Sequence, residues 1–260
     1  KPIDSYHVSY MIAPRMNAAG RMSSPDIALR LLLASDDGMI AEARDLAAQL
    51  NTENERRQQE ERGILAEARK AVEGDPDIGA RAALVVSGEG WHRGVIGIVA
   101  SRLVDAYHRP AVVLAVEGDT AHGSCRSIPG FDMLEALTAC GAHLKQFGGH
   151  RAAAGVTVAR GRIRAFRDAL TAWADDHLGP DDLRPRLRID GRLGFRQITP
   201  RLYDGIAQLA PFGTGNPKPT FWTPGARLAD GPRRLKERHL SMSLRQDGVD
   251  SVADLGHGAQ

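Results

Sequence analysis

Short apolar runs alternate with longer amphipathic segments between residues 81 and 177, and this alternation limits the possible folds more than any other feature of the chain. The runs typical of buried strands occupy residues 82–86, 110–116, 120–127 and 153–158. The segments with helical spacing occupy residues 91–107, 132–147 and 162–177. Because strands and helices follow one another in this way, we predict an α/β domain in which helices cover a mixed sheet.

Two segments precede this domain, which we place at residues 79–180. Residues 1–22 are predicted to be an irregular lead-in, and residues 23–78 a helical linker. Ser24 and Pro25 suit the N-cap and first turn of a helix, and apolar positions at helical spacing predict a longer helix over residues 39–72. The almost wholly charged middle of that helix is either a solvated face or a bridge between domains.

The tail, residues 184–260, has alternating polar and apolar positions that predict antiparallel strands. The expected elements are a strand at 187–193, a helix at 200–209, and strands at 239–245 and 249–255 joined by a hairpin turn at 246–248. So few strands predict an incomplete, OB-like β-barrel. The tail carries 13 Lys and Arg against 7 Asp and Glu, whereas the preceding 183 residues carry 21 against 25. This basic tail either has a polyanionic partner or carries scattered solubilising arginines.

The composition argues against several classes of protein. Hydrophobic residues make up 42% of the chain and charged residues 25%, as in ordinary globular domains. No apolar run approaches the roughly 18 residues of a membrane span, so we expect no membrane partner. Cys125 and Cys140 are too few for a disulfide framework or a zinc site, which favours a reducing, cytoplasmic location. The chain opens at Lys1 without methionine, which we interpret as the edge of an excised fragment.

A candidate phosphate site lies in the string Gly123-Ser124-Cys125-Arg126-Ser127. Alternate side chains of a strand share a face, so Ser124 and Arg126 are predicted to point the same way. A hydroxyl and a guanidinium on one face can hold the same phosphate, and arginine provides a charge-assisted, bidentate contact. The alternative is an exposed strand face with an incidental arginine.

A second candidate is Gly148-Gly149-His150, between a predicted helix and a predicted strand. Glycines permit positive φ and close backbone approach, so their N–H groups can face an anion. His150 can donate to a phosphate oxygen or act as an acid. The alternative is a glycine C-cap followed by a structural histidine.

Two weaker candidates lie elsewhere. His92 lies at the start of the helix predicted over residues 91–107, where backbone N–H groups and the helix dipole favour an anion; alternatively, His92 only caps that helix. Asn17 and Arg21 form an amide and arginine cluster in backbone that we predict to be irregular. They are either anchors of that loop or contacts to a ligand.

Four strings occur in a specific order: residues 15–21 (RMNAAGR), 91–103 (WHRGVIGIVASRL), 123–128 (GSCRSI) and 147–150 (FGGH). In this order they resemble the RecJ-type single-stranded-DNA exonucleases of the DHH phosphoesterase superfamily. The resemblance runs from about residue 5 to the end of the chain. Each string alone is weak, but the ordered set is highly specific.

The resemblance implies an enzyme that degrades single-stranded DNA from the 5′ end with Mn or Mg, in recombination and repair. Residues 1–22 would end the metal-binding DHH domain, residues 79–180 would be the DHH-associated domain that binds substrate, and residues 184–260 would be part of an oligonucleotide-binding barrel. It implies phosphate binding by Ser124, Arg126, Gly148, Gly149 and His92, a catalytic role for His150, and DNA contacts by Asn17 and Arg21.

The chain departs from this family in containing no Asp-His-His triplet. We therefore expect the metal ligands upstream of Lys1, no metal bound by this chain, and no activity from it alone. The expected partners are single-stranded DNA and, as candidate proteins, a single-strand-binding protein or a helicase. Two alternatives are a non-catalytic single-stranded nucleic-acid-binding module and a sister phosphoesterase acting on short oligonucleotides; the basic tail argues against the second.

Overall fold

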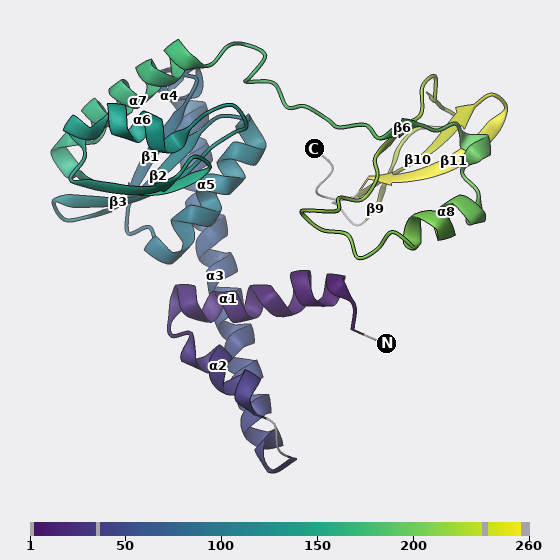
Figure 1. Cartoon of the computed structure of the whole chain (residues 1–260), viewed down its shortest axis with the longest axis horizontal. Helices are drawn as coiled ribbons and strands as arrows, with labels where there is room; N and C mark the ends of the chain where they lie inside the picture. Colours follow the sequence, from purple (N-terminus) through teal and green to yellow (C-terminus); the bar gives the residue numbers. More distant parts are fainter. Residues whose placement is uncertain (1–2, 35–36, 236–238, 256–260) are drawn as a thin grey trace. The chain divides into compact units, whose positions relative to one another are not determined.

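The computed structural model describes residues 3–34, 37–235 and 239–255. The chain divides into two compact units, Lys1–Pro185 and Arg186–Gln260, and each is described by itself (Figure 1). The first unit is the predicted α/β domain with its helical extension, and the second is rich in short strands. In the described part of the chain, no helix combines the length and the apolar character that crossing a membrane requires.

Residues 5–22 are helical, so the prediction of an irregular lead-in is wrong. A π-helical segment, His7–Ile12, continues directly into α1 (Ala13–Met22). Asn and Gly are weak helix formers, which made this string resemble a loop. Ala18 and Ala19 are fully buried, however, and Ala19 packs with Leu50 of α3. Tertiary packing therefore overrides the local propensity of this segment.

The predicted helical linker is confirmed. It consists of α2 (Asp26–Leu33), α3 (Ile40–Gly74) and the short α4 (Pro76–Gly79). The first of these helices has Pro25 at its N-cap in place of Ser24, while the Ser24 hydroxyl accepts a hydrogen bond from the Asp26 N–H at 3.2 Å. The C-terminal half of α3 packs its apolar face against the sheet domain.

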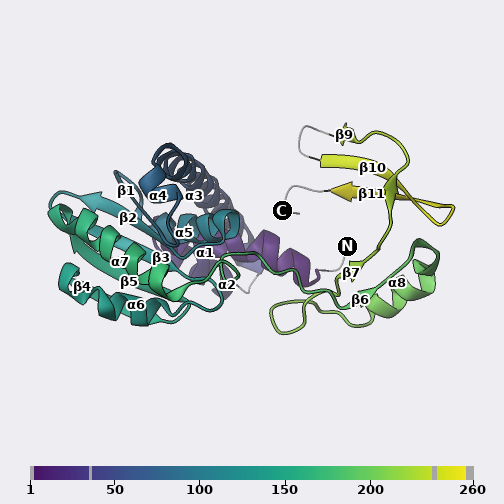
Figure 2. The same ribbon diagram turned by 90° about the horizontal axis from the view of Figure 1, so that it is seen from above.

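Five strands form one mixed sheet in the order β1-β2-β3-β5-β4. Figure 2 shows the sheet from β1, beside α3, to β4 at the opposite edge. Only the β1 and β2 pair is parallel, and α5 (Arg93–Tyr107) forms the crossover between them. The strands are β1 (Leu84–Glu89), β2 (Ala111–Glu117), β3 (Thr120–Arg126), β4 (Gln146–His150) and β5 (Ala153–Ala159).

The two faces of this sheet are covered unequally. On one face, alternate strand residues such as Val112 and Cys125 pack with α6 (Met133–Ala139) and α7 (Ile163–His177) in a core around the fully buried Phe166. On the other face, residues such as Val113 pack with α5 and α3. Each large side chain buried in these cores contributes roughly 1.5–3 kcal/mol. Because α5 and α3 lie over β1, β2 and part of β3, this second face stays open over β5 and β4.

The predicted helix over residues 132–147 is too long. It ends at Ala139, a 3-10 turn follows at Gly141–His143, and the chain then enters β4. The Gly148 string therefore lies within an edge strand rather than in a helix-to-strand loop. Two adjacent glycines concealed this strand from sequence reasoning, because glycine is depleted in strands and only pairing with β5 organises it.

The described residues of the second unit form a four-stranded sheet, a separate two-stranded pair, an α-helix and a short 3-10 helix at Phe195–Gln197. The predicted hairpin is confirmed, since β10 and β11 pair through Asp247 and Gly248, both with positive φ. The strand predicted at 187–193 is only two residues long, Gly191–Arg192. Leu187 and Ile189 are exposed, and only Gly191 and Arg192 pair with another strand, at Phe221 and Trp222. The elements are β6 (Gly191–Arg192), α8 (Pro200–Ala207), β7 (Phe221–Trp222), β8 (Arg227–Leu228), β9 (Arg233–Leu235), β10 (His239–Gln246) and β11 (Val249–Leu255).

Candidate functional site

The first turn of α5 organises one end of the candidate site. His92 is the N-cap of this helix, and its Nδ1 accepts a hydrogen bond from the Gly94 N–H at 3.1 Å. The capping alternative for His92 is therefore correct, and its Nε2 is left as the N–H donor. Arg21 reaches the same turn from α1, where its Nη1 donates to the Gly94 carbonyl at 3.1 Å. A Cβ at Gly94 would lie 2.2 Å from the Arg21 carbonyl oxygen, so glycine allows this helix contact.

The next turn of α5 contacts the predicted phosphate-binding pair. Arg126 Nη1 donates to Ser124 Oγ at 3.1 Å and to the Cys125 carbonyl at 2.8 Å, so the two side chains share a face as predicted. A Cβ at Gly97 would lie 3.0 Å from Ser124 Oγ and 3.2 Å from Arg126 Nη2. Glycine at this position thus gives the hydroxyl and the guanidinium the space they occupy.

Strand register brings His150 onto the same face as Arg126. Arg126 pairs with Ala153 of β5, and Ala153 pairs with His150 of β4, so the three residues form one cross-strand row. The backbones of Arg126 and His150 are two strand spacings, about 9.6 Å, apart. His150 is exposed, and its Nδ1 accepts a hydrogen bond from the Ala152 N–H at 3.3 Å, which leaves Nε2 as the donor toward a ligand.

The surroundings of Gly148 and Gly149, the two residues before His150, differ. Gly149 has a φ of 152°, and a Cβ there would lie 2.4 Å from the Ala153 carbonyl oxygen. Packing against β5 therefore requires glycine at 149, and the predicted contact of its N–H group with an anion stays a prediction. Gly148 faces the open side, and nothing lies within 4 Å of a Cβ placed on it. No protein contact explains the missing side chain of Gly148, which is consistent with access for a ligand.

A groove of about 500 Å³ runs over this open face. Its floor includes Gly155 and Gly148, which are paired with each other and in register with Ser124. Among the described residues that line it, Arg93 is the one formally charged side chain and none is acidic. The lining residues are Arg93, Ile96, His122, Gly123, Ser124, Gln146, Phe147, Gly148, Gly155, Val156 and Thr157.

Sequence reasoning missed part of this groove. His122, Thr157 and Gln146 form a second cross-strand row beside that of Ser124. The sequence does indicate His122, because residues 122, 124 and 126 alternate along one strand and their side chains therefore share a face. The roles of Thr157 and Gln146 depend on which strands pair, and the sequence does not show that.

Asn17 lies one helical turn before Arg21 on α1 and is exposed. Because residues four apart share a helix face, both side chains are on the same side of α1. Their regular helical setting replaces the irregular backbone that we predicted. Arg21 contacts the first turn of α5, whereas Asn17 lies one turn of α1 away from that contact. Neither residue lines the groove that contains Ser124.

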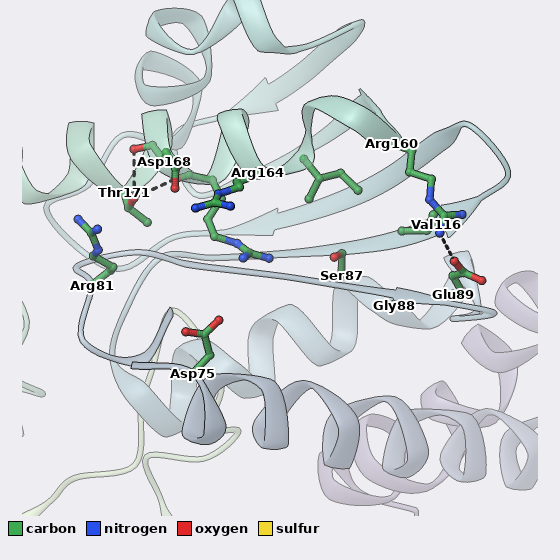
Figure 3. Close-up of a pocket in the computed structure, with 12 residues that line it drawn as sticks. Asp75, Arg81, Ser87, Gly88, Glu89, Val116, Arg160, Arg164, Asp168 and Thr171 are labelled. Atoms are coloured by element: carbon green, nitrogen blue, oxygen red, sulfur yellow. Dashed lines mark hydrogen bonds and ion pairs between the residues drawn. The ribbon is translucent and has the colours of Figure 1, made fainter. Parts of the chain in front are cut away.

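A larger hollow, of about 850 Å³, lies on the other side of the sheet between β1 and α7 (Figure 3). Its arginines are mostly engaged within the protein. Arg160 pairs with Glu89, as the dashed line in Figure 3 shows, and Arg167 Nε donates to the Val85 carbonyl at 3.0 Å. Acidic Asp75, Glu89 and Asp168 also line this hollow. Its arginines therefore share the hollow with acids, whereas no acid is among the described residues that line the groove over the open face.

Neither cysteine belongs to the site. Both are free and buried on the covered side of the sheet. Burial raises the pKa of the Cys125 thiol to about 12 and that of Cys140 to about 11. Within the described ranges, no group of three or more His, Cys, Asp or Glu side chains could hold a metal ion. The residues present therefore do not fit a divalent-metal centre.

Comparisons with known proteins cover both units. Residues 80–176 match the DHHA1 domain family, and residues 189–256 match the RecJ OB domain family. The sheet, its helices and the groove fall within the first match, and the strands of the second unit fall within the second.

The relatives are single-stranded-DNA-specific exonucleases named RecJ. The chain is 38% identical to that of Bacillus subtilis over 244 residues, which is 92% of this chain and 30% of the relative. It is 38% identical to that of Thermus thermophilus over 92% of this chain and 33% of the relative. Crystal structures of Thermus thermophilus RecJ with Mg²⁺ and with Mn²⁺ both superpose with a TM-score of 0.79 over 95% of this chain, at 33% and 34% identity, covering 37% and 35% of those chains. The chain thus spans about a third of the length of these relatives.

Proposed function

Because the chain carries a DHHA1 domain followed by a RecJ OB domain and is a homologue of the RecJ exonucleases, we propose that it is the substrate-binding portion of a single-stranded-DNA exonuclease. In the intact protein this enzyme removes nucleotides from the 5′ end in DNA recombination and repair. The single observation that carries the proposal is the Ser124 hydroxyl, which lines a glycine-floored groove with no acid among its described lining residues and accepts a hydrogen bond from Arg126 beside that groove.

The groove suits a phosphodiester backbone. Arg126 donates charge-assisted hydrogen bonds, and the Ser124 hydroxyl beside it can donate to the same phosphate. His150, in the row of Arg126, presents Nε2–H to the phosphate group or to the departing oxygen. The contribution of these residues is to hold and orient the phosphate, which lowers the entropic part of the reaction barrier.

Metal chemistry belongs to another part of the intact protein. Two related crystal structures contain RecJ in complex with Mg²⁺ and with Mn²⁺, whereas the described residues of this chain offer no ligand set. We propose that the metal ligands lie outside these 260 residues and that this chain alone binds DNA without cleaving it. A non-catalytic binding module is therefore the second candidate function, and it describes the chain on its own.

Exposed aromatic side chains in the second unit support binding of single-stranded DNA as well. Trp222 is 54% exposed, and Phe221 precedes it on β7. Exposed aromatic side chains among arginines can stack bases and attract the backbone without reading sequence. We further propose a cytoplasmic location, supported by two free cysteines. A single-strand-binding protein or a helicase as a partner is likewise a proposal, resting on the role in repair.

The test compares Arg126, which holds Ser124 beside the groove, with an arginine of the larger hollow. Fluorescence anisotropy would measure binding of the 260-residue chain to 5′-phosphorylated and 5′-hydroxyl oligothymidylate over a series of salt concentrations. Arg126→Ala should weaken binding about 10- to 100-fold, more strongly for the phosphorylated end, because it removes charged hydrogen bonds. Arg164→Ala, an exposed arginine of the hollow in Figure 3, is the matched control and should change affinity less than twofold.

The same series tests the mode of binding. Affinity should fall with salt at a slope of about −0.7 per phosphate contacted. In the intact protein, His150→Ala should reduce cleavage more than binding. Equal effects of Arg126→Ala and Arg164→Ala, or binding that does not depend on salt, would contradict the proposal.

A further inference from the structure

The row next to Ser124 on the open face contains three polar side chains that the protein itself does not use. His122, Thr157 and Gln146 are paired across β3, β5 and β4, so their side chains project from the same face. Among the described residues, none of these three side chains makes a hydrogen bond, although all three carry donors. Neighbouring unused donors in a groove are a feature of a surface that binds an acceptor-rich ligand.

This row continues the groove that begins at Ser124. His122 lies two positions before Ser124 on β3, and this step corresponds to about 6.8 Å along the strand. That separation is comparable to the spacing of neighbouring phosphates in an extended single strand of DNA. Between the two rows the floor is smooth, because Gly155 and Gly148 have no side chains there and nothing fills the space above them.

The charges around the row have the sign that a phosphate requires. Arg93 lines the groove from the α5 side. Lys145 Nζ donates a hydrogen bond to Thr120 Oγ1 at 2.9 Å. Thr120 lies two positions before His122 on β3, so both side chains project from the same face of the strand. The Lys145 ammonium group therefore lies beyond the His122 row. Arg93 Nη1 forms an ion pair with Glu117 Oε2 at 3.9 Å, and Glu117 itself does not line the groove.

From these observations we propose that His122, Thr157 and Gln146 form a second phosphate subsite, which binds the phosphate next to the one held by Ser124 and Arg126. The ligand is the backbone of a single-stranded oligonucleotide, with the intervening sugar over the floor formed by Gly155 and Gly148. This inference rests on the proposed function of the groove and adds the direction in which the nucleic acid leaves the first phosphate.

Two small ligands separate the subsites. Thymidine 5′-monophosphate has one phosphate, and the 5′-phosphorylated dinucleotide pdTdT has two. NMR titration of the full 260-residue chain would give the dissociation constant of each ligand and follow the Cε1–H resonance of each histidine. His122→Ala should weaken pdTdT about three- to tenfold and leave the mononucleotide unchanged, whereas Arg126→Ala should weaken both. The His122 resonance should shift with pdTdT and not with the mononucleotide.

Control variants keep this test decisive. His177→Ala removes a histidine at the end of α7, where it stacks on Trp173, and should not alter either affinity. Thr157→Val removes a hydroxyl from the row while keeping a β-branched strand residue, so it tests the same subsite if His122→Ala does not fold.

The outcomes distinguish this inference from the proposed function. Equal pdTdT affinity in the wild type, His122→Ala and Thr157→Val would overturn the second subsite while leaving the first. Equal weakening of both ligands by His122→Ala would also overturn it, because the histidine would then act on the first phosphate. If the wild type bound neither ligand, the proposed function itself would fail, and the second subsite with it.

Discussion

The two faces of the five-stranded sheet use glycine for opposite purposes. On the face covered by α6 and α7, a Cβ at Gly123 would lie 2.5 Å from Leu114 and Val156 side-chain atoms, and one at Gly149 would meet the β5 backbone. On the open face, Gly148 and Gly155 have no protein atom closer than 3.9 Å to a Cβ. Glycine on the covered side permits close packing, whereas glycine on the open side leaves a groove that packing does not require.

The two hollows of the unit differ in the same way. In the hollow between β1 and α7, Arg160 pairs with Glu89 and Arg167 donates to the Val85 carbonyl, so most of its arginines have partners within the protein. The groove on the open face has no acid among its described lining residues, and Arg126 beside it donates to the Ser124 hydroxyl and the Cys125 carbonyl. The smaller groove is therefore the stronger candidate for an anion site, because no acid is among its described lining residues and no protein contact explains the bare glycine at 148.

The largest expected effect contrasts the adjacent glycines of β4. Gly149→Ala should lower the free energy of unfolding by about 2–4 kcal/mol, because its Cβ would meet backbone atoms that cannot move away and its φ disfavours alanine. Gly148→Ala, one residue earlier, should change it by less than about 0.5 kcal/mol. Urea unfolding of both variants measures this difference. Similar stability losses would remove the contrast between the faces.

An intermediate effect should come from filling the groove floor. Gly155→Val should leave stability unchanged or raise it by up to about 1 kcal/mol, because glycine weakens a strand interior. It should nevertheless reduce oligothymidylate affinity about fivefold or more, since the new side chain occupies the floor. Ala172→Val, exposed on α7, is the control for affinity. Undiminished binding by Gly155→Val would show that the floor is not used.

The smallest expected effect concerns the helix side of the groove. Gly97→Ala would place a Cβ 3.0 Å from Ser124 Oγ, and the flexible side chains of Ser124 and Arg126 can yield by a few tenths of an ångström. We expect oligothymidylate affinity to fall about two- to threefold, with thermal unfolding little changed. A loss of stability with intact affinity would instead assign Gly97 to helix packing alone.

The local sequence pattern was sufficient to predict most helices and strands of the first unit. The alternation of apolar runs predicted β1, β2, β3, β5, α5 and α7 to within a few residues, and strand parity predicted that Ser124 and Arg126 share a face. These inferences succeed because side-chain periodicity is set by backbone geometry within one element. The ordered strings also indicated the family, which the domain matches then supported.

Only the tertiary structure decided how these elements form a groove. The glycine-rich β4 became visible through its pairing with β5, and that pairing alone places His150 in the row of Arg126 and Gln146 in the row of His122. Burial of Ala19 against Leu50 of α3 likewise stabilises a helix in a segment whose sequence is typical of a loop. Strand register and helix packing depend on contacts between residues far apart in the sequence, whereas the periodicity of one segment carries no information about its neighbours.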